Sequence, residues 1–198
     1  MTSALDDVAD RIPTLDRPVL VAIDGADGAG KTTFADALVS RLAGRVVVRA
    51  SVDDFHHPRA HRHAFGRTGQ TVWERSFDLD ALRRELLDPW RRGPGSAYRR
   101  RWHDLATDSY ADEPSEQVPD RGILLLDGVF SQRPELADVW DVVVWLEVPD
   151  AVRVARMAAR DGGVDDLVDP DQQRYLEAQR IYRDLCDPMA TADVVVRG

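Results

Sequence analysis

The sequence predicts an α/β fold in which a five-stranded, mostly parallel sheet carries helices on both faces. Short apolar runs alternate along the chain with segments of helical periodicity. The first apolar run leads directly into the pattern Gly25-x-x-x-x-Gly30-Lys31-Thr32. Strands that alternate with helices form parallel sheets, because each helix carries the chain back across a face of the sheet. We therefore expect residues 1–198 to form a single domain of three layers.

The segment from residue 18 to 33 organises the rest of the chain. Residues 19–23 form an apolar run that is typical of a strand buried on both faces, and a helical pattern begins at Thr33. The glycines between them let the loop curl so that backbone N–H groups point inward, and the helix N-terminus adds partial positive charge. This is the P-loop pattern, in which Lys31 reaches the β- and γ-phosphates of ATP and Thr32 binds Mg²⁺.

The alternative for this segment is a glycine-rich turn with an incidental lysine, but its strand–loop–helix context favours a nucleotide site. Lys31 is also the only lysine in the chain. It stands at a position that favours a compact point charge over a planar guanidinium group. The predicted fold is therefore the three-layer sandwich of P-loop NTPases, with ATP and Mg²⁺ as cofactors. The predicted ATP-binding residues are Gly25, Ala26, Asp27, Gly28, Ala29, Gly30, Lys31, Thr32 and Thr33.

The other elements are predicted in chain order from the same patterns. A short helix is expected over residues 3–12, and Gly44 ends the helix that follows the P-loop. A second buried strand is expected over residues 45–50. The later strands are expected at residues 123–126, 142–148 and 194–196, and the later helices at residues 79–90, 151–160 and 172–185.

One gap breaks this alternation. About seventy residues separate the second strand from the third, far more than an ordinary crossover needs. We expect a substrate-binding insertion over residues 56–118, with one helix, a turn at residues 93–95 and a hairpin or loop at residues 98–102. A long excursion beside a phosphate-binding sheet is where a second substrate is expected to be held. A lid region is expected over residues 150–163.

Composition and charge restrict the function classes. The net charge of −9 argues against a general binder of nucleic acids or of membrane surfaces. The single cysteine, Cys186, excludes an internal disulfide framework and suits a reducing cytosol. No apolar run has the length of a membrane span, and the first twenty residues lack the layout of a signal peptide. We expect a cytoplasmic protein that acts on a small molecule, and the sequence is compatible with a homo-oligomer.

Acidic residues follow two of the predicted strands, at the edge of the sheet where the P-loop opens. Asp53 and Asp54 come after the second strand, and Asp127 ends the third in the Walker B arrangement. Asp53 could accept the proton of an attacking hydroxyl group or hold Mg²⁺, and the alternative is an aspartate pair that caps a turn. Thr32, Asp127 and Asp53 are the predicted metal-binding residues, and Asp53 and Lys31 are also predicted to be catalytic.

Three arginines share one face of the helix that follows the fourth strand. Arg153, Arg156 and Arg160 are spaced i, i+3 and i+7. Such a face can close over a triphosphate and neutralise charge in the transition state, so Arg153 and Arg156 are predicted to be catalytic. The alternative is a solvated stripe on a surface helix.

Two further clusters are ambiguous. Four histidines at residues 56, 57, 61 and 63 suggest a zinc site, but no cysteine lies near them, and a loop that contacts substrate is the favoured interpretation. Most of the arginines at residues 83, 84, 91, 92, 99, 100 and 101 are expected to be solvated or paired with acids, with a phosphorylated substrate as the alternative.

Several of these motifs, in this order, resemble the uridine kinase branch of P-loop kinases, which also includes phosphoribulokinase and bacterial pantothenate kinase. The motifs are Asp53-Asp54-Phe55-His56, Phe77-Asp78, Tyr98 with His103, Leu126-Asp127-Gly128 and residues 192–196. The resemblance implies that Asp53 is the general base, that Asp78 binds ribose hydroxyls and that Tyr98 and His103 contact the pyrimidine. The expected substrate-binding residues are Asp78, Tyr98, His103, Phe55, His56 and Arg174.

Arg174 is a departure from that family. It lies where uridine kinases have a base-reading glutamine, and arginine offers only donors. The sequence predicts an ATP-dependent kinase of a primary hydroxyl, with the 5′-hydroxyl of uridine or cytidine as the first expectation. The alternatives are a kinase of pantothenate, a sugar or a sugar phosphate and, more distantly, a nucleotide-dependent regulator. A guanine-specific switch would need an Asn-Lys-x-Asp motif, which a chain with Lys31 as its only lysine does not contain.

Overall fold

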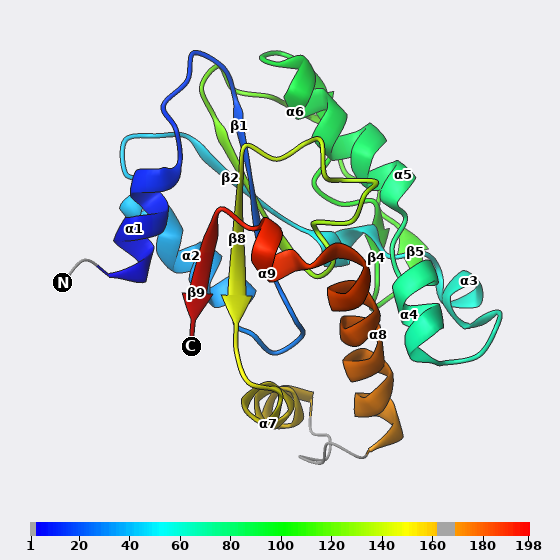
Figure 1. Ribbon diagram of the computed structural model, residues 1–198. Helices are drawn as coiled ribbons and strands as arrows, with labels where there is room; N and C mark the ends of the chain where they lie inside the picture. Colours follow the sequence, from blue (N-terminus) through cyan, green and yellow to red (C-terminus); the bar gives the residue numbers. More distant parts are fainter. Residues whose placement is uncertain (1–2, 162–168) are drawn as a thin grey trace.

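The computed structural model describes residues 3–161 and 169–198 (Figure 1). Within them, five strands form one sheet in the order β2-β7-β1-β8-β9, and each neighbouring pair is parallel. The strands are β1 (Val19–Gly25), β2 (Val47–Ser51), β7 (Ile123–Gly128), β8 (Val142–Glu147) and β9 (Val194–Arg197). Helices cover both faces, and the predicted three-layer α/β fold is confirmed.

The helices outside the insertion follow the predicted order. α2 begins at Lys31, two residues before the expected start, and residues 162 and 163 of the expected lid lie outside the described residues. The helices are α1 (Ala4–Arg11), α2 (Lys31–Arg41), α3 (Arg59–His63), α4 (Gly69–Arg75), α5 (Leu79–Leu82), α6 (Asp88–Arg92), α7 (Asp150–Asp161), α8 (Pro170–Cys186) and α9 (Pro188–Thr191). In the described part of the chain, no helix combines the length and apolar character that crossing a bilayer requires.

The two faces of the sheet bury separate apolar clusters. Because successive side chains of a strand point to opposite faces, Val19, Val21 and Ile23 of β1 pack with α1 and α2 on one side. Leu20 points to the other side, where α4, α5, α6 and α8 cover the sheet. Figure 1 shows these two layers to the left and right of the sheet. The central strands β1 and β7 are buried along their whole length, which explains their unbroken apolar runs.

The second strand differs from its prediction. It was expected to be buried, but β2 is an edge strand that pairs only with β7, and most of its residues are half-buried. Val46, which belonged to the expected strand, precedes β2 and is exposed. Three consecutive valines do not distinguish a central strand from an edge strand, because strand order is set by the whole topology.

The insertion is more helical than the sequence suggested. α3 and α4 were not expected, and the expected helix at residues 79–90 is continuous from α5 to α6 through a π-helical segment, Arg83–Leu87. Residues 99–102, within the expected hairpin or loop, form a loop, and two short antiparallel ladders flank it. In these, β3 (Ala97–Tyr98) pairs with β6 (Glu116–Gln117), and β4 (His103–Asp104) pairs with β5 (Ser109–Tyr110). α4 packs on α8 instead of extending into solvent, so the insertion forms one wall of the cleft described next.

Candidate active site

The P-loop connects β1 to α2 and borders a cavity of about 480 Å³ at the carboxyl edge of the sheet. This P-loop cavity is lined by Gly28, Gly30 and the first turn of α2, residues 31–33. The first N–H groups of a helix have no partner within the helix, so this turn offers donors and a positive dipole end. The ammonium group of Lys31 donates to the carbonyl oxygen of Ala26 at 3.0 Å and lines the same cavity. The arrangement fits a polyphosphate.

Gly28 keeps the loop close to α7. Its φ is +75°, and a Cβ atom at this position would lie 2.5 Å from the carbonyl oxygen of Arg153. The Arg153 side chain is only 3% exposed, and it donates to the carbonyl oxygen of Asp27 at 2.9 Å and to Asp150 at 2.5 Å. Arg153 therefore braces the P-loop backbone. Of the three arginines on the helix, Arg156 and Arg160 are among the described residues that line the P-loop cavity, and Arg153 is not.

Two of the three expected magnesium residues, Thr32 and Asp127, are in direct contact. The hydroxyl of Thr32 donates to Asp127 Oδ2 at 2.7 Å, and Arg49 donates to Asp127 Oδ1 at 2.5 Å. The described residues contain no group of three or more His, Cys, Asp or Glu that could hold a metal ion. Mg²⁺ in nucleotide sites is bound by one or two protein oxygens together with phosphates and water, so Thr32 and Asp127 fit the ion when it arrives with a nucleotide.

A second cavity, of about 490 Å³, adjoins the P-loop on the side of α2 and β9. It shares Gly30, Thr33 and Arg156 with the P-loop cavity, and most of its other lining residues are apolar, among them Phe34 and Val148. We call it the apolar cavity. An apolar slot beside a phosphate cradle suits the flat faces of a nucleobase, so the two cavities together match the two ends of ATP.

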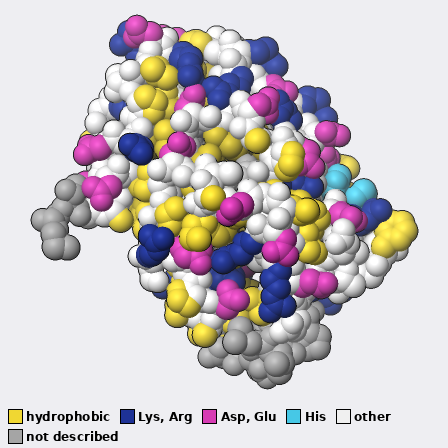
Figure 2. Space-filling view, in the orientation of Figure 1, with side chains coloured by type: hydrophobic (Ala, Val, Ile, Leu, Met, Phe, Trp, Pro, Cys, Tyr) yellow, Lys and Arg dark blue, Asp and Glu magenta, His cyan; other side chains and the backbone are white. Residues whose placement is uncertain are grey.

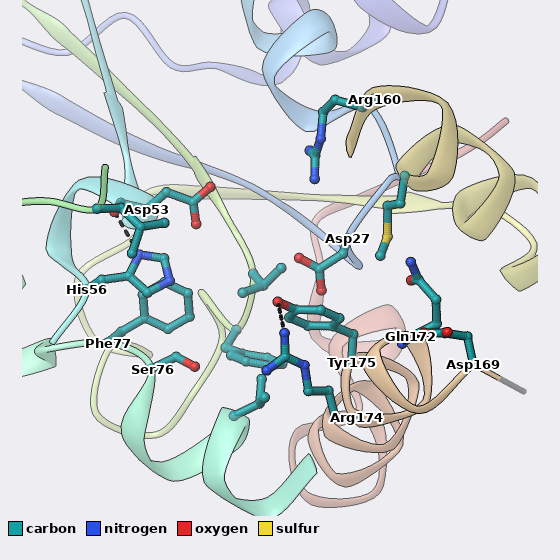
Figure 3. A pocket seen from close by; sticks show the side chains of 15 residues that line it. Asp27, Asp53, His56, Ser76, Phe77, Arg160, Asp169, Gln172, Arg174 and Tyr175 are labelled. Carbon is teal, nitrogen blue, oxygen red and sulfur yellow. Dashed lines mark hydrogen bonds between the residues drawn. The ribbon is translucent and has the colours of Figure 1, made fainter. Parts of the chain in front are cut away.

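A third cavity, of about 450 Å³, adjoins the P-loop cavity and shares Asp27, Asp53 and Arg160 with it (Figure 3). This central cavity is lined by residues of the insertion, α7 and α8, including His56, Phe77, Gln172, Arg174 and Tyr175. Figure 3 shows these side chains around one hollow, with Asp53 and Asp27 at its border. Its mixture of aromatic, amide and charged groups suits a small polar molecule.

Asp53 lies where the P-loop cavity and the central cavity meet, because it lines both of them. Its place is set by the 3₁₀ turn Val52–Phe55, in which the Asp53 amide donates to Ser51 Oγ at 3.2 Å. The walls of the cleft displace water from the Asp53 carboxyl and raise its pKa, and nearby Asp27 and Asp127 act in the same direction. The charges of His56 and Lys31 lower this pKa. Asp54 points elsewhere and accepts a hydrogen bond from Arg101 at 2.9 Å.

A buried aspartate fixes the P-loop strand to α8. Asp24 is fully buried near the end of β1, and its carboxyl accepts hydrogen bonds from the hydroxyl of Tyr182 at 2.5 Å and from the amide of Gln132 at 3.1 Å. Desolvation raises the pKa of Asp24, against the effect of these hydrogen bonds. The network ties α8, which carries Arg174 and Tyr175, to the strand that ends in the P-loop. Nothing in the local sequence pattern indicated this contact.

The structure brings only two of the six expected substrate-binding residues to the central cavity, His56 and Arg174. Phe55 is buried in the core between the sheet and the insertion. Asp78 caps α5 by accepting the amide of Ala81 at 2.9 Å. His103 is 1% exposed and lies 3.4 Å from Asp108.

Tyr98 is likewise absent from the described residues that line the central cavity. It is 2% exposed, its hydroxyl donates to Glu116 at 3.2 Å, and its ring contacts Trp90. Burial and the charge of Glu116 raise the pKa of Tyr98 to about 12. These contacts are those of a packing residue of the insertion. Conversely, Gln172 and Tyr175 line the cavity and were not predicted, because a helical pattern does not show which of its residues face a distant wall.

Comparisons with known proteins agree with this geometry. The sequence matches the model of the AAA domain family over residues 21–177, which is most of the chain. The chain belongs to the AAA domain family. It is 23% identical over 188 residues to the uridine kinase of Ligilactobacillus salivarius (strain UCC118), a match that covers 87% of this chain and 85% of that protein.

Solved structures show the same fold for this AAA domain protein. The structure of a possible uridine kinase from Bacillus stearothermophilus superposes with a TM-score of 0.71 at 24% identity, over 97% of this chain and 96% of that one. Phosphoribulokinase from Rhodobacter spheroides gives a TM-score of 0.59 at 12% identity, over 92% of this chain and 70% of that one. The expected resemblance is confirmed: the protein is a small-molecule kinase that is similar to uridine kinases.

Proposed function

We propose that this AAA domain protein transfers the γ-phosphoryl group of ATP to a primary hydroxyl group of a small molecule held in the central cavity. The observation that carries the proposal is the position of Asp53 between the P-loop cavity and the central cavity. A group at this junction can contact the hydroxyl of one substrate while that hydroxyl faces the phosphates of the other.

The residues have separate roles in this reaction. The backbone of residues 28–33 and Lys31 hold the phosphates, and Thr32 and Asp127 would hold Mg²⁺, which neutralises phosphate charge when bound. Asp53 accepts the hydroxyl proton as the new oxygen–phosphorus bond forms, and the bond between the γ-phosphorus and the bridging oxygen breaks so that ADP leaves with its electron pair. Arg156 and Arg160 line the cavity where negative charge develops and stabilise it there.

The first candidate acceptor is the 5′-hydroxyl of uridine or cytidine, which the names of the curated relatives and the motifs of the sequence support. A second candidate is an acidic alcohol, such as pantothenate or a sugar phosphate. It is supported by Arg174, which lines the cavity, stands where uridine kinases have a glutamine and offers only donors.

Replacing Asp53 tests the proposed reaction. Asp53→Asn should lower turnover by about 10²–10⁴-fold, because the amide cannot take the proton, while the affinity for ATP should change little. Turnover is measured as ADP released with uridine, cytidine, pantothenate and sugar acceptors, and the product is identified by mass spectrometry.

Asp54→Asn is the matched control, because Asp54 is adjacent and its carboxyl is paired with Arg101. Its turnover should stay within a few-fold of the parent chain. Equal turnover of Asp53→Asn and Asp54→Asn would remove Asp53 from the mechanism.

A further inference from the structure

Asp27 lies where the P-loop cavity and the central cavity meet, because it lines both of them. Its backbone belongs to the predicted ATP-binding loop, but its side chain has no role in the proposed transfer of the phosphoryl group. Figure 3 shows the Asp27 carboxylate at the border of the hollow, with Asp53 and Tyr175 on other parts of that border. A carboxylate offers only acceptors and repels phosphate oxygens, so this side chain does not suit the triphosphate.

The backbone around Asp27 is held in place. The loop forms a turn in which the amide of Ala29 donates to the carbonyl oxygen of Ala26 at 3.1 Å. Gly28 supplies the positive φ, +75°, that this turn requires. The guanidinium group of Arg153 donates to the carbonyl oxygen of Asp27 at 2.9 Å. Because the turn and this carbonyl group are fixed, the Asp27 carboxylate has a defined place beside the central cavity.

The carboxylate of Asp27 is available to a ligand. Among residues 3–161 and 169–198, none donates a hydrogen bond to it or forms an ion pair with it. It lies near a second acid, because its charge raises the pKa of Asp53. Acidic and basic side chains are intermixed on the face of the molecule that Figure 2 shows, whereas these two acids stand together. An acceptor that fills the central cavity displaces water from the Asp27 carboxylate, which then needs a donor.

The other acids near this cavity have different partners. The family resemblance implied that Asp78 binds hydroxyl groups, but Asp78 caps α5 and is not among the described residues that line the central cavity. The acids of the described lining are Asp27, Asp53 and Asp169. Asp169 accepts the backbone amide of Gln172 at 3.2 Å, and Asp53 is assigned to the reacting hydroxyl. Asp27 is therefore the carboxylate that can take a second hydroxyl group.

The position of Asp27 also limits where that hydroxyl lies. The central cavity adjoins a fourth cavity, of about 270 Å³, with which it shares His56, Ser76 and Tyr175, among others. We call it the α3 cavity, because α3 contributes to its wall. Asp27 and Asp53 do not line the α3 cavity. Both carboxylates thus stand at the end of the acceptor hollow that borders the phosphates, close to the reacting hydroxyl.

We propose that Asp27 is a specificity-determining residue that accepts a hydrogen bond from a second hydroxyl group of the acceptor, near the primary hydroxyl that Asp53 deprotonates. The acceptor is therefore a polyol. An apolar group at this position would leave the carboxylate desolvated without a donor, and an anionic group there would be repelled. This inference rests on the proposed kinase function and names a residue that selects its acceptor.

Acceptor pairs that differ by one hydroxyl test the inference. Uridine is compared with 2′-deoxyuridine and with 3′-deoxyuridine, glycerol with 1,3-propanediol, and pantothenate with its 2-deoxy derivative, and every member keeps a primary hydroxyl. With Mg²⁺ and ATP, the hydroxyl-rich member of at least one pair should have a kcat/KM about tenfold higher or more. Asp27→Ala should bring the two members to within about twofold of each other. Equal use of both members by the parent chain, in every pair that reacts, would overturn the inference and leave the kinase function standing.

Two variants separate hydroxyl recognition from other roles of Asp27. Asp27→Ala should raise the KM of the hydroxyl-rich acceptor roughly tenfold or more, while kcat falls far less than in Asp53→Asn. Asp27→Asn keeps an acceptor oxygen and should recover part of this loss. The affinity for ATP should be unchanged or higher in both variants, because a negative charge beside the phosphates is removed. A loss of kcat as large as that of Asp53→Asn, equal for both members of each pair, would overturn the proposal by making Asp27 a base.

A binding measurement distinguishes failure of this inference from failure of the kinase function. The acceptors are titrated by calorimetry into the parent chain, Asp27→Ala and Asp10→Ala, with Mg²⁺ and a non-hydrolysable ATP analogue present. Asp10→Ala is the control, since Asp10 is exposed on α1 and lines neither cavity.

A preference for the hydroxyl-rich member that Asp27→Ala removes and Asp10→Ala keeps would support the role of Asp27. This holds even if no acceptor is phosphorylated, a result that would count against the proposed kinase function instead. Acceptor binding that is absent in every pair, or a preference that is the same in all three chains, would overturn the role of Asp27.

Discussion

The donor side of the cleft, formed by the P-loop and apolar cavities, and the acceptor side, formed by the central and α3 cavities, are built in different ways. On the donor side, the phosphate cradle consists of the consecutive residues 25–33, with Asp127 placed beside them by the register of β1 and β7. The acceptor side combines the insertion with α7 and α8, so its walls come from segments about a hundred residues apart. A phosphate cradle can thus be encoded locally, whereas an acceptor site is assembled by packing.

The two sides also differ in the chemical groups that they present to their substrates. The donor side presents backbone N–H groups, the ammonium group of Lys31 and the guanidinium groups of Arg156 and Arg160, which suit the phosphates of any triphosphate. The acceptor side presents side chains, and among the described residues that line it five carry guanidinium groups. We therefore expect changes on the donor side to affect ATP with every acceptor, and changes on the acceptor side to affect one class of acceptor.

Among the changes that test this difference between the two sides, the largest effect is expected for the affinity for ATP when Gly28 is replaced. Gly28→Ala forces a Cβ atom against the carbonyl oxygen of Arg153, so the loop must move, and the affinity for ATP should fall roughly tenfold or more. Gly66→Ala is the matched control, since Gly66 also has a positive φ, +90°, but nothing lies within 4 Å of its Cβ position.

Both glycine variants should lose about 1–2 kcal/mol of unfolding free energy through backbone strain. Calorimetric titration with ATP and denaturant unfolding measure the two quantities. If Gly28→Ala bound ATP as well as Gly66→Ala does, the close contact between the P-loop and α7 would be irrelevant to nucleotide binding.

An intermediate effect is expected at two tyrosines of the acceptor side. Tyr175 lines the central and α3 cavities and holds Arg174 through its hydroxyl, so Tyr175→Phe should raise the KM of the acceptor about fivefold, the loss of one hydrogen bond of about 1 kcal/mol. Tyr98→Phe should leave that KM unchanged and lower the free energy of unfolding by about 1 kcal/mol, through its bond with Glu116. The opposite result would restore the role that the family resemblance implied for Tyr98.

The smallest effect is expected in the pH dependence of turnover. Asp53 accepts a proton only when ionised, and desolvation by the surrounding walls of the cleft raises its pKa. Turnover should therefore fall on acidification at a higher pH than an ordinary aspartate, with a pKa of about 3.9, would require. The affinity for ATP should stay level over the same range, because the phosphate cradle does not use Asp53. A turnover profile that stays flat to pH 4, with the chain still folded by circular dichroism, would contradict this assignment.

The sequence predicted the elements whose signals are local. The apolar runs located the strands, and the P-loop pattern located the cavity that Lys31 and Thr32 line. The spacing of Arg153, Arg156 and Arg160 placed them on one helix, but not relative to the loop. The structure buries Arg153 against the P-loop, where its guanidinium group donates to the carbonyl oxygen of Asp27.

The sequence by itself determined the three-layer fold and the phosphate cradle, because hydrophobic periodicity and backbone conformation are properties of neighbouring residues. Only the tertiary structure decided which side chains face the acceptor. Tyr175 and Arg174 line the same cavity as His56 and the arginines of α3, although more than a hundred residues of sequence separate the two segments. Contacts with α4 and the hydrogen bond from Tyr182 to Asp24 hold α8 in this place. Such contacts depend on the packing of whole helices, which no local pattern in the chain records.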